Sequence, residues 1–338
     1  MLKNIARSMS TMLPETSRDS PVDVLIIGAG PAGLSCSSSL ARLLHTCIVF
    51  SSENFRNQKS KHMHGVLTWE HRDAAEFRAA ARKDILANYS TTSFQDSTIM
   101  RLEKLARNDG TSLFKATDET GKEWWGRKVV IATGIKDIMP EIEGYEECWG
   151  TGIFHCLFCH GYEERGSKSA GVLAIDDCAP AGAALHMARY ANRLAEKVTI
   201  YTNGNESVTK DIEKALSQCK PESKTRKNVT VDSRSILKMV KGAKGGEVEV
   251  HLEGGEKTLQ GFLAHKPKGK VNGPFVEQLG LELTPQGDIK TSLPFNETSV
   301  HGVFAGGDSA TPLKAVTVAL SAGGFLAAGV AAQLEVED

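Results

Sequence analysis

One stretch near the N-terminus decides the fold: Val22-Asp23-Val24-Leu25-Ile26-Ile27-Gly28-Ala29-Gly30-Pro31-Ala32-Gly33. Its first six residues form a short, β-branched apolar run of the kind that becomes a buried parallel strand. The next six have the spacing Gly-x-Gly-x-x-Gly, and leucines at helical spacing follow over residues 34–43. A second apolar run at residues 46–50 completes a strand, glycine turn, helix and strand. This order predicts an α/β dinucleotide-binding unit.

Each glycine of this turn has a physical role in such a unit. Gly28 permits the tight turn, Gly30 lets a pyrophosphate approach the backbone, and Gly33 lets the helix and the strand pack closely. The helix that opens at Pro31 and Ala32 points its N-terminus at the phosphates, where the helix dipole favours negative charge. A glycine turn without a ligand is the weaker interpretation, because the full context is present.

The residues after the second strand depart from the usual pattern. An acid normally follows this strand and binds the ribose hydroxyls. Here the sequence reads Ser51-Ser52-Glu53, so either Glu53 reaches the ribose from two residues further on or a serine hydroxyl replaces it. Arg56, Asn57, His62 and His64 follow. The two histidines have a spacing that could bind a metal, but no acid or cysteine cluster accompanies them, so we expect a loop over the cofactor and no metal site.

The redox chemistry of the chain is predicted at His155-Cys156-Leu157-Phe158-Cys159-His160-Gly161-Tyr162-Glu163. A Cys-x-x-Cys pair can close into a disulfide and reopen, and flanking histidines can transfer the protons. Half of a zinc site and two buried structural thiols are the alternatives. A four-ligand zinc site usually needs a second pair at similar spacing, and the remaining five cysteines are scattered through the chain. Redox chemistry is therefore favoured.

A second strand, turn, helix and strand follow the cysteines, at residues 170–175, 183–195 and 197–201. The turn reads Asp176-Asp177-Cys178-Ala179-Pro180-Ala181-Gly182, with a single glycine and two carboxylates that would repel a pyrophosphate. After the next strand, Thr202-Asn203-Gly204-Asn205 offers no basic side chain for the 2′-phosphate of NADPH. This pattern predicts a nucleotide-binding fold without its nucleotide.

Two more buried strands end in small residues. Residues 128–131 lead into Ala132-Thr133-Gly134, and residues 302–305 lead into Gly306-Gly307-Asp308. The acid can bond cofactor hydroxyls. An alanine-rich helix then opens near residues 311–316, and its N-terminus can stabilise negative charge on a bound ring.

The composition limits the class of protein. With 338 residues, 41% apolar content and a net charge of −1, the chain is long enough for two globular domains and has no electrostatic footprint for nucleic acid or an anionic membrane. Seven cysteines favour a reducing compartment over a disulfide-stapled secreted scaffold. No apolar core follows the first basic residues, so no secretory signal is predicted.

Two stretches resemble targeting segments. Residues 1–20 combine basic residues with serines and threonines, which faintly resembles a mitochondrial presequence, but a disordered leader is the simpler interpretation. Residues 315–334 are uncharged and long enough to cross a bilayer. Because they are mainly alanine and glycine, we expect a buried helix packed closely on a cofactor domain.

Together the motifs resemble the low-molecular-weight thioredoxin reductase family of flavoproteins, over nearly all of residues 22–334. The glycine turn, Ala132-Thr133-Gly134, Cys156-x-x-Cys159 and Gly306-Gly307-Asp308 stand in the family's order. The resemblance implies an α/β fold of two Rossmann-like, three-layer domains. A discontinuous FAD domain would take residues 21–143 and 263–338, and an inserted redox domain of degenerate NADPH type would take residues 144–262. It also implies a homodimer.

The resemblance assigns residues to the cofactor and to the reaction. The residues expected at the FAD site are Gly28, Gly30, Pro31, Ala32, Gly33, Ser51, Glu53, Arg56, Asn57, His64, Ala132, Thr133, Gly134, Gly307, Asp308, Lys314, Ala315 and Val316. Cys159 would be the flavin-facing sulfur and Cys156 the sulfur that a substrate thiolate attacks. His160, with an ordinary pKa of about 6.5, can take thiol protons at neutral pH. His155 is either a second base or an ordinary buried histidine.

Two departures narrow the resemblance. Thioredoxin reductases carry an acid directly after the second cysteine, where this chain has His160, and they keep an intact NADPH fingerprint. Both departures are similar to the fungal branch typified by the gliotoxin oxidoreductase. Members of that branch are FAD-dependent dithiol oxidases that close disulfides in natural products and pass electrons to oxygen, with hydrogen peroxide as the product.

The resemblance therefore implies a dithiol oxidase of secondary metabolism, acting on a small-molecule dithiol and oxygen. An NADPH-dependent disulfide reductase for a small protein partner is the main alternative, and a flavin-binding protein with a regulatory role is the third. We expect no nucleic-acid or membrane partner. We also expect a cytoplasmic location, with mitochondria as the alternative that the leader suggests.

Overall fold

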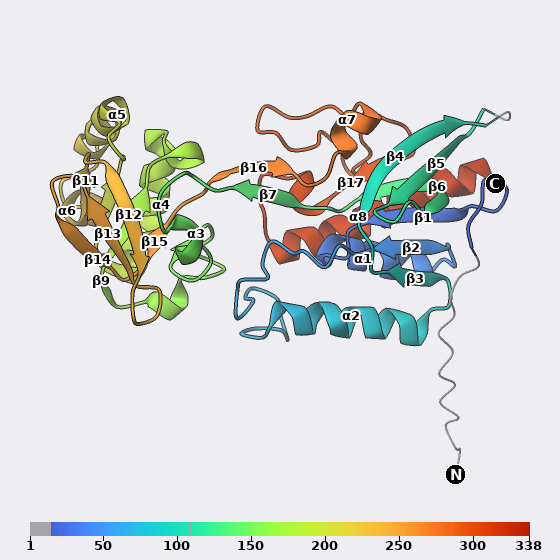
Figure 1. Ribbon diagram of the computed structural model, residues 1–338, viewed down its shortest axis with the longest axis horizontal. Helices are drawn as coiled ribbons and strands as arrows, with labels where there is room; N and C mark the ends of the chain where they lie inside the picture. The colour runs from blue at the N-terminus through green and yellow to red at the C-terminus, as the bar shows by residue number, and fades with distance from the viewer. Residues whose placement is uncertain (1–14, 108–109) are drawn as a thin grey trace, which may run out of the picture. The chain divides into compact units, whose positions relative to one another are not determined.

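The computed structural model describes residues 15–107 and 110–338, and the chain divides into two compact units (Figure 1). The first unit takes residues up to Gln58, Ala74–Lys136 and Lys270–Asp338, and the second takes Lys59–Asp73 and Asp137–Gly269. Most of the predicted leader, residues 1–14, lies outside the described residues.

The division between the units differs in detail from the predicted domains, which change after residues 143 and 262. The units divide at residues 136/137 and 269/270. Strands β7 (Ile135–Ile138) and β16 (Lys268–Val271) pair with each other where the chain passes from one unit to the other. Lys59–Asp73 belongs to the second unit because its histidines contact the cysteine loop described below.

The first unit is built on a mixed seven-stranded sheet in the order β3-β2-β1-β6-β5-β4, with β17 also paired to β6. One long strand, β6 (Glu123–Ile131), pairs antiparallel with β5 at its start and parallel with β1 and β17 at its end. The strand predicted at residues 128–131 is therefore the end of the longer strand β6. The other strands are β1 (Val22–Ile27), β2 (Cys47–Phe50), β3 (Thr92–Gln95), β4 (Ile99–Ala106), β5 (Ser112–Asp118) and β17 (Val303–Ala305).

Both faces of this sheet are covered, which gives the unit three layers. Helices α1 (Pro31–Ala41) and α8 (Val316–Glu337) pack on the face that carries Val24, Ile26 and Val49. The opposite face packs against Phe114 of β5 and against α7 (Phe275–Leu279). Helix α2 (Ala74–Asn88) lies beside α1. The parallel strands are buried on both faces, as their continuous apolar runs predict.

Helix α8 is long and apolar enough to cross a membrane, judged by length and composition alone. Here it packs along α1, where the hydroxyl of Ser35 donates to the carbonyl of Leu320 over 2.7 Å. A Cβ added to Gly323 would lie 2.5 Å from the backbone oxygen of Ala32. The two backbones approach closely only because small residues line the contact, which explains why the helix is rich in alanine and glycine.

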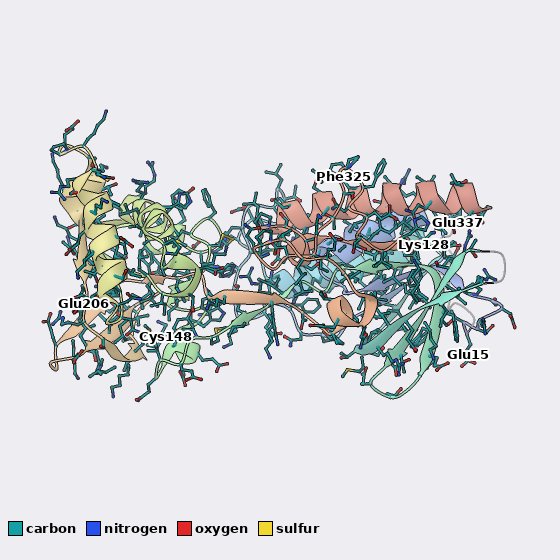
Figure 2. The ribbon with its side chains drawn as sticks, turned by 90° about the horizontal axis from the view of Figure 1, so that it is seen from above. Glu15, Lys128, Cys148, Glu206, Phe325 and Glu337 are labelled. Atoms are coloured by element: carbon teal, nitrogen blue, oxygen red, sulfur yellow. A yellow bond between two sulfur atoms is a disulfide. The ribbon has the colours of Figure 1, made fainter. Side chains whose placement is uncertain are left out.

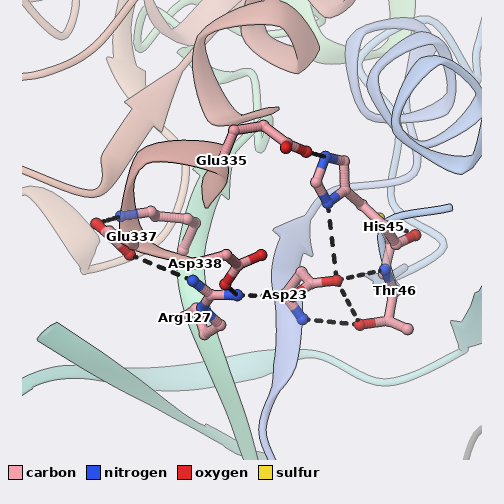
Figure 3. A network of polar contacts seen from close by, with 9 residues as sticks. Asp23, His45, Thr46, Arg127, Glu335, Glu337 and Asp338 are labelled. Carbon is pink, nitrogen blue, oxygen red and sulfur yellow. Dashed lines mark hydrogen bonds and ion pairs between the residues drawn. The ribbon is translucent and has the colours of Figure 1, made fainter. Parts of the chain in front are cut away.

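A network of charges holds the C-terminal end of α8 to the sheet (Figures 2 and 3). Lys128, which is buried in β6, pairs with Glu337, and Arg127 pairs with Asp338 over 2.7 Å and with Asp23 over 3.4 Å. The network also contains His45, Thr46 and Glu335. Removing Glu337 would leave the Lys128 ammonium buried without its carboxylate, a change that typically costs about 3–5 kcal/mol.

The second unit contains a parallel five-stranded sheet in the order β11-β10-β9-β15-β8. Helix α4 (Ala181–Leu194) packs on β9 and β10, and α5 (Glu206–Ser217) packs on α4. The strands are β8 (Ile153–Phe154), β9 (Ser167–Leu173), β10 (Ala195–Tyr201), β11 (Val229–Asp232) and β15 (Leu263–Ala264). The predicted fold class is confirmed, since an α/β unit with a parallel sheet is inserted into another.

Residues 219–246 contain regular structure, although their richness in lysine, serine and glycine is typical of loops. Helix α6 (Lys224–Asn228), β11 and β12 (Ile236–Lys241) lie there. Strand β12 pairs with β13 (Val248–Leu252), which in turn pairs with β14 (Lys257–Gln260), in an antiparallel sheet. Ile236 and Met239 are buried, but the lysines around them hide this short apolar pattern in the sequence.

Candidate active site

The glycine turn of the first unit has the geometry that its spacing predicts. Gly28 has φ +116°, and a Cβ added to it would lie 2.3 Å from the carbonyl oxygen of Ala132. A Cβ on Gly33 would lie 1.9 Å from the carbonyl oxygen of Gly28. In contrast, a Cβ on Gly30 would meet no atom of the described residues within 4 Å. Gly28 and Gly33 therefore serve the packing of the protein, and Gly30 leaves open space beside the turn.

The N-terminus of α1 faces this turn without a side-chain cap. The helix begins at Pro31 after Gly30, which has no side chain, and the first helical bond runs from the amide of Leu34 to the carbonyl of Gly30 over 3.0 Å. The amides of Ala32 and Gly33 precede that bond, and such amides lack helical acceptors. Amides of this kind, at the positive end of a helix dipole, attract a phosphate.

A buried hydroxyl also fits a bound dinucleotide. Thr133 Oγ1 is buried and has no hydrogen-bond partner among the described residues. It lies in the turn after β6, between Ala132 and Gly134, which has φ +68°. Buried hydroxyls are normally paired, so an unpaired one beside an open glycine and an uncapped helix is consistent with an absent partner. The residues present therefore fit the dinucleotide that the sequence predicts.

Other predicted cofactor residues are joined to one another. Asp308, in the turn after β17, accepts a bond from Arg56 over 3.2 Å. Lys314 donates to the backbone oxygen of Asp308 over 2.8 Å and to Asp288 over 2.7 Å. Asn57 accepts from Arg78 over 3.1 Å. Ala315 and Val316 form the start of α8.

The two candidates for the ribose contact differ in burial. Ser51 is buried at the end of β2, and its hydroxyl accepts a bond from the amide of Glu53 over 3.4 Å. Glu53 is exposed, with φ +53°. The buried serine lies directly at the strand end, where a ribose contact is expected, whereas the acid lies in the exposed turn beyond it.

The cysteines of the second unit form a disulfide, Cys156–Cys159, with a Cα–Cα distance of 5.2 Å. They lie in a turn after β8, in which the amides of Cys159 and His160 both donate to the carbonyl of Cys156, over 3.1 and 2.9 Å. The amide of Cys159 also lies 3.1 Å from the Cys156 sulfur, to which it donates. This turn holds the two sulfurs together, so the pair is able to cycle between disulfide and dithiol.

His160 directly follows Cys159, and its ring is partly buried in the second unit. Its ring stacks on Phe154 with centroids 5.6 Å apart, and its buried Nε2 has no hydrogen-bond partner among the residues described. Burial lowers the pKa of His160, and the nearby His64 lowers it further. Glu163 and a hydrogen bond to the backbone of His62 oppose this shift. A neutral imidazole with an unpaired nitrogen can accept a thiol proton.

The other predicted histidine, His155, stacks on Trp149 with centroids 5.7 Å apart. His64, which the sequence assigns to the cofactor, lies in the second unit. Its Nδ1 is 2.7 Å from the carbonyl oxygen of Cys159, its Nε2 is 3.2 Å from Glu163 Oε1, and Nε2 is also 3.1 Å from Nδ1 of His71. The sequence gives no signal for His71, because only the fold brings it beside the cysteine turn.

Glu163 belongs to the same group of side chains. Burial alone would raise the pKa of its carboxyl, but backbone amides, together with His64 and His71, outweigh burial and hold the pKa below its usual range. Glu163 is therefore ionised at neutral pH, beside the histidines and four residues after Cys159.

The second nucleotide turn carries acids, as predicted. Asp176 is the first residue of a short 3-10 helix, Asp176–Cys178, and its own φ is +50°. Helix α4 begins after Pro180 without a side-chain cap. Burial raises the pKa of Asp176. The fold also brings Arg234 past the end of β11, but Asp232 and Glu256 each bind it over 2.6 Å. This arginine, which the sequence prediction missed, is therefore held by two carboxylates.

A buried histidine lies beside this turn. His265 is fully buried; its Nδ1 lies 2.7 Å from the Tyr145 hydroxyl and its Nε2 lies 3.3 Å from the carbonyl of Ile175. The carbonyl can only accept, so Nε2 carries the proton and the tyrosine donates to Nδ1. Burial lowers the pKa of His265 to about 4, which keeps the ring neutral at pH 7.

We expect the protein to lose stability in acid because of His265. In the unfolded chain its pKa is about 6.5, so between pH 6.5 and about 4 the unfolded state binds more protons, and the free energy of unfolding falls as the pH is lowered. The loss approaches about 3 kcal/mol at pH 4. Urea midpoints measured from pH 7.5 to 5 test this expectation. His265→Gln should flatten the slope and exposed His186→Gln should not; equal slopes in all three proteins would contradict it.

Comparisons with known proteins agree with the geometry. The family described as pyridine nucleotide-disulphide oxidoreductase matches residues 22–323. Thioredoxin reductase aclD of Aspergillus oryzae is 41% identical over 318 residues, which cover 94% of this chain and 97% of that protein. Thioredoxin reductase sirT of Leptosphaeria maculans is 41% identical over 314 residues, which cover 91% of this chain and 93% of that protein. The crystal structure of a putative thioredoxin reductase, TrxB from Bacillus anthracis, matches with a TM-score of 0.81 at 25% identity. The match covers 94% of this chain and 99% of that one.

Proposed function

This chain belongs to the pyridine nucleotide-disulphide oxidoreductase family, and from that premise we propose that it oxidises a small-molecule dithiol to a disulfide. It is an oxidoreductase of the thioredoxin reductase-like type, and FAD is its cofactor. The proposed electron acceptor is oxygen and the proposed by-product is hydrogen peroxide. The proposed setting is the biosynthesis of a natural product.

The observation that carries the proposal is the turn before α4. A nicotinamide dinucleotide would need to place its pyrophosphate there, but Asp176 and Asp177 bring negative charge to the turn. Arg234, the arginine at the end of β11, is bound by Asp232 and Glu256. In a protein that does not bind NADPH, the electrons must enter from another donor. We propose a thiol substrate, because the disulfide Cys156–Cys159 of the second unit can accept two electrons from thiols.

The proposed reaction consists of two thiol–disulfide exchange steps at the cysteine turn. A substrate thiolate attacks the sulfur of Cys156, the Cys156–Cys159 bond breaks, and Cys159 leaves as a thiolate. The second substrate thiolate attacks the sulfur of this mixed disulfide that belongs to the substrate, which releases Cys156 as a thiolate and forms the product disulfide. His160 takes a thiol proton through its unpaired Nε2. When bound, FAD supplies the acceptor for the two electrons of the reduced cysteine pair.

A reductase is the second candidate function, because the relatives aclD and sirT are both named thioredoxin reductase. A reductase would run the same exchange in reverse, with NADPH as the electron source and a disulfide as the substrate. The two functions share the cysteines and FAD, and they differ in where the electrons enter.

The deciding experiment reduces the yellow holoprotein under anaerobic conditions and monitors the absorbance of its flavin. We expect a small dithiol to bleach the flavin and NADPH to leave it oxidised, since the second turn repels a pyrophosphate. Admitting air should restore the colour and release one peroxide for each dithiol oxidised. Dithionite serves as the control that the flavin can be reduced. Rapid bleaching by NADPH would overturn the oxidase and favour the reductase.

A further inference from the structure

Beyond the oxidation of thiols, we propose that His64, His71 and Glu163 form a binding site for a divalent transition metal of the zinc class. The three side chains come from two segments of the second unit, the loop Lys59–Asp73 and the turn after Cys159. Each offers one ligand atom, and these atoms lie within 4.8 Å of one another. The site lies beside the redox disulfide and uses neither of its sulfurs.

The spacing of the three atoms matches the coordination that zinc prefers. His64 Nε2 is 3.1 Å from His71 Nδ1 and 3.2 Å from Glu163 Oε1, and the remaining edge, from His71 Nδ1 to Glu163 Oε1, is 3.8 Å. A tetrahedral zinc ion with bonds of about 2.0–2.1 Å separates its ligands by about 3.3 Å. The three atoms therefore outline one face of such a tetrahedron before any ion is bound.

A hydrogen bond to the backbone orients the most buried of the three ligands. His64 Nδ1 lies 2.7 Å from the carbonyl oxygen of Cys159, which can only accept a hydrogen bond, so Nδ1 carries a proton. In the neutral ring the lone pair then belongs to Nε2, the atom that faces Glu163 and His71. Metal-binding histidines are commonly held by such a bond from the other ring nitrogen. A lone pair that faces a carboxylate requires a positive charge between them, either a proton or a metal ion.

The surroundings allow an ion to enter. The His64 side chain is 12% exposed, whereas those of His71 and Glu163 are 59% and 37% exposed, so the cluster opens to solvent on one side. His62 stacks on His71 with centroids 4.1 Å apart and supports its ring. Two imidazoles and one carboxylate favour zinc and its neighbours over magnesium or calcium. The fourth position would be left for water or an anion.

Binding there would join the histidine loop to the redox turn. Glu163 follows Cys159 by four residues, and His64 donates to the carbonyl of Cys159 itself. An ion held by both segments would restrain the backbone around Cys159. We therefore expect bound zinc to slow reduction of the Cys156–Cys159 disulfide by a phosphine, which is a thiol-free reductant.

The test is equilibrium dialysis of the untagged, yellow holoprotein in its disulfide form against zinc chloride, with metal content measured by mass spectrometry. All proteins carry Cys219→Ser, because Cys219 is a partly exposed thiol. We expect one zinc per chain at micromolar free zinc. His71→Ala and Glu163→Gln should each weaken binding at least about tenfold. His186→Ala, which removes an exposed imidazole outside the cluster, should bind as the parent does.

Three results would overturn the site. The parent protein could take up no zinc below millimolar concentrations, which is expected if a shared proton alone holds the three groups. The His71 and Glu163 variants could bind as tightly as the parent while they keep the parent's flavin content and melting temperature. Finally, His186→Ala could lose binding, which would place the ion elsewhere. A slower phosphine reaction on adding zinc, absent in His71→Ala, would support the proposed link to the disulfide.

Discussion

Replacing Cys159 with serine is expected to abolish turnover of a dithiol, by at least about 10³-fold, while the protein stays yellow. The exchange needs a second sulfur to leave as a thiolate when the substrate attacks, and a serine oxygen cannot provide one. Cys156→Ser should lose turnover equally. Neither residue belongs to the unit that contains the glycine turn, so the flavin content should be retained in both variants.

The two variants are expected to differ in what they trap. Cys159→Ser keeps the sulfur that meets the substrate, so incubation with an oxidised substrate should leave a mixed disulfide on Cys156 that intact-mass measurement detects. Cys156→Ser should leave far less, because Cys159 is assigned to the flavin side. Cys148→Ser, at a buried free cysteine of the second unit, is the control and should turn over normally (Figure 2). Loss of FAD in either active-site variant would indicate a structural role instead.

Gly33→Ala is expected to disrupt the first unit and with it the binding of FAD. The new methyl would stand 1.9 Å from the carbonyl oxygen of Gly28, which is backbone and cannot swing aside. Such an overlap forces helix α1 away from β1, at a cost of about 3 kcal/mol or more. Expression in the soluble fraction, melting temperature and the ratio of flavin to protein absorbance measure the effect.

Gly30→Ala is the matched control at the same turn. Its methyl would meet no described atom within 4 Å, and φ at this residue is −75°, which any residue adopts. The apoprotein should therefore melt within a few degrees of the parent. The methyl would, however, occupy the space that a pyrophosphate approaches, so FAD affinity should fall about tenfold or more. A Gly30→Ala protein that binds FAD normally would mean that the phosphates lie elsewhere.

The parallel core of the fold was predictable because its signals are local. An apolar run, a glycine turn and an apolar helix follow one another within residues 22–50, and each step has its own spacing. Strand β12 was not predictable in the same way. Its buried Ile236 and Met239 are separated by exposed or half-buried neighbours, including Lys238, and only pairing with β13 makes it a strand.

The candidate site also has a part that local sequence signals predict and a part that depends on tertiary contacts. The disulfide and the glycine turn are motifs of nearly consecutive residues, so both can be predicted from the sequence. The group around His64 depends on tertiary contacts, because the acid that accompanies the histidines lies about one hundred residues away along the chain, at Glu163. The sequence therefore suggested no metal ligand set there. The homodimer, the substrate and the cytoplasmic location stay predictions.

The order of the segments along the chain has a consequence for synthesis on the ribosome. Strand β17 and helix α8, which complete the sheet and cover α1, are made after the second unit, whereas the partners they join, β6 and α1, emerge before most of it. The second unit needs nothing beyond Gly269, so it can fold while the first is still unfinished. Lys128 meets Glu337 only after the whole of α8 has been made. The nascent chain therefore exposes an unfinished flavin domain until α8 has left the ribosome, and chaperones have that interval to protect it.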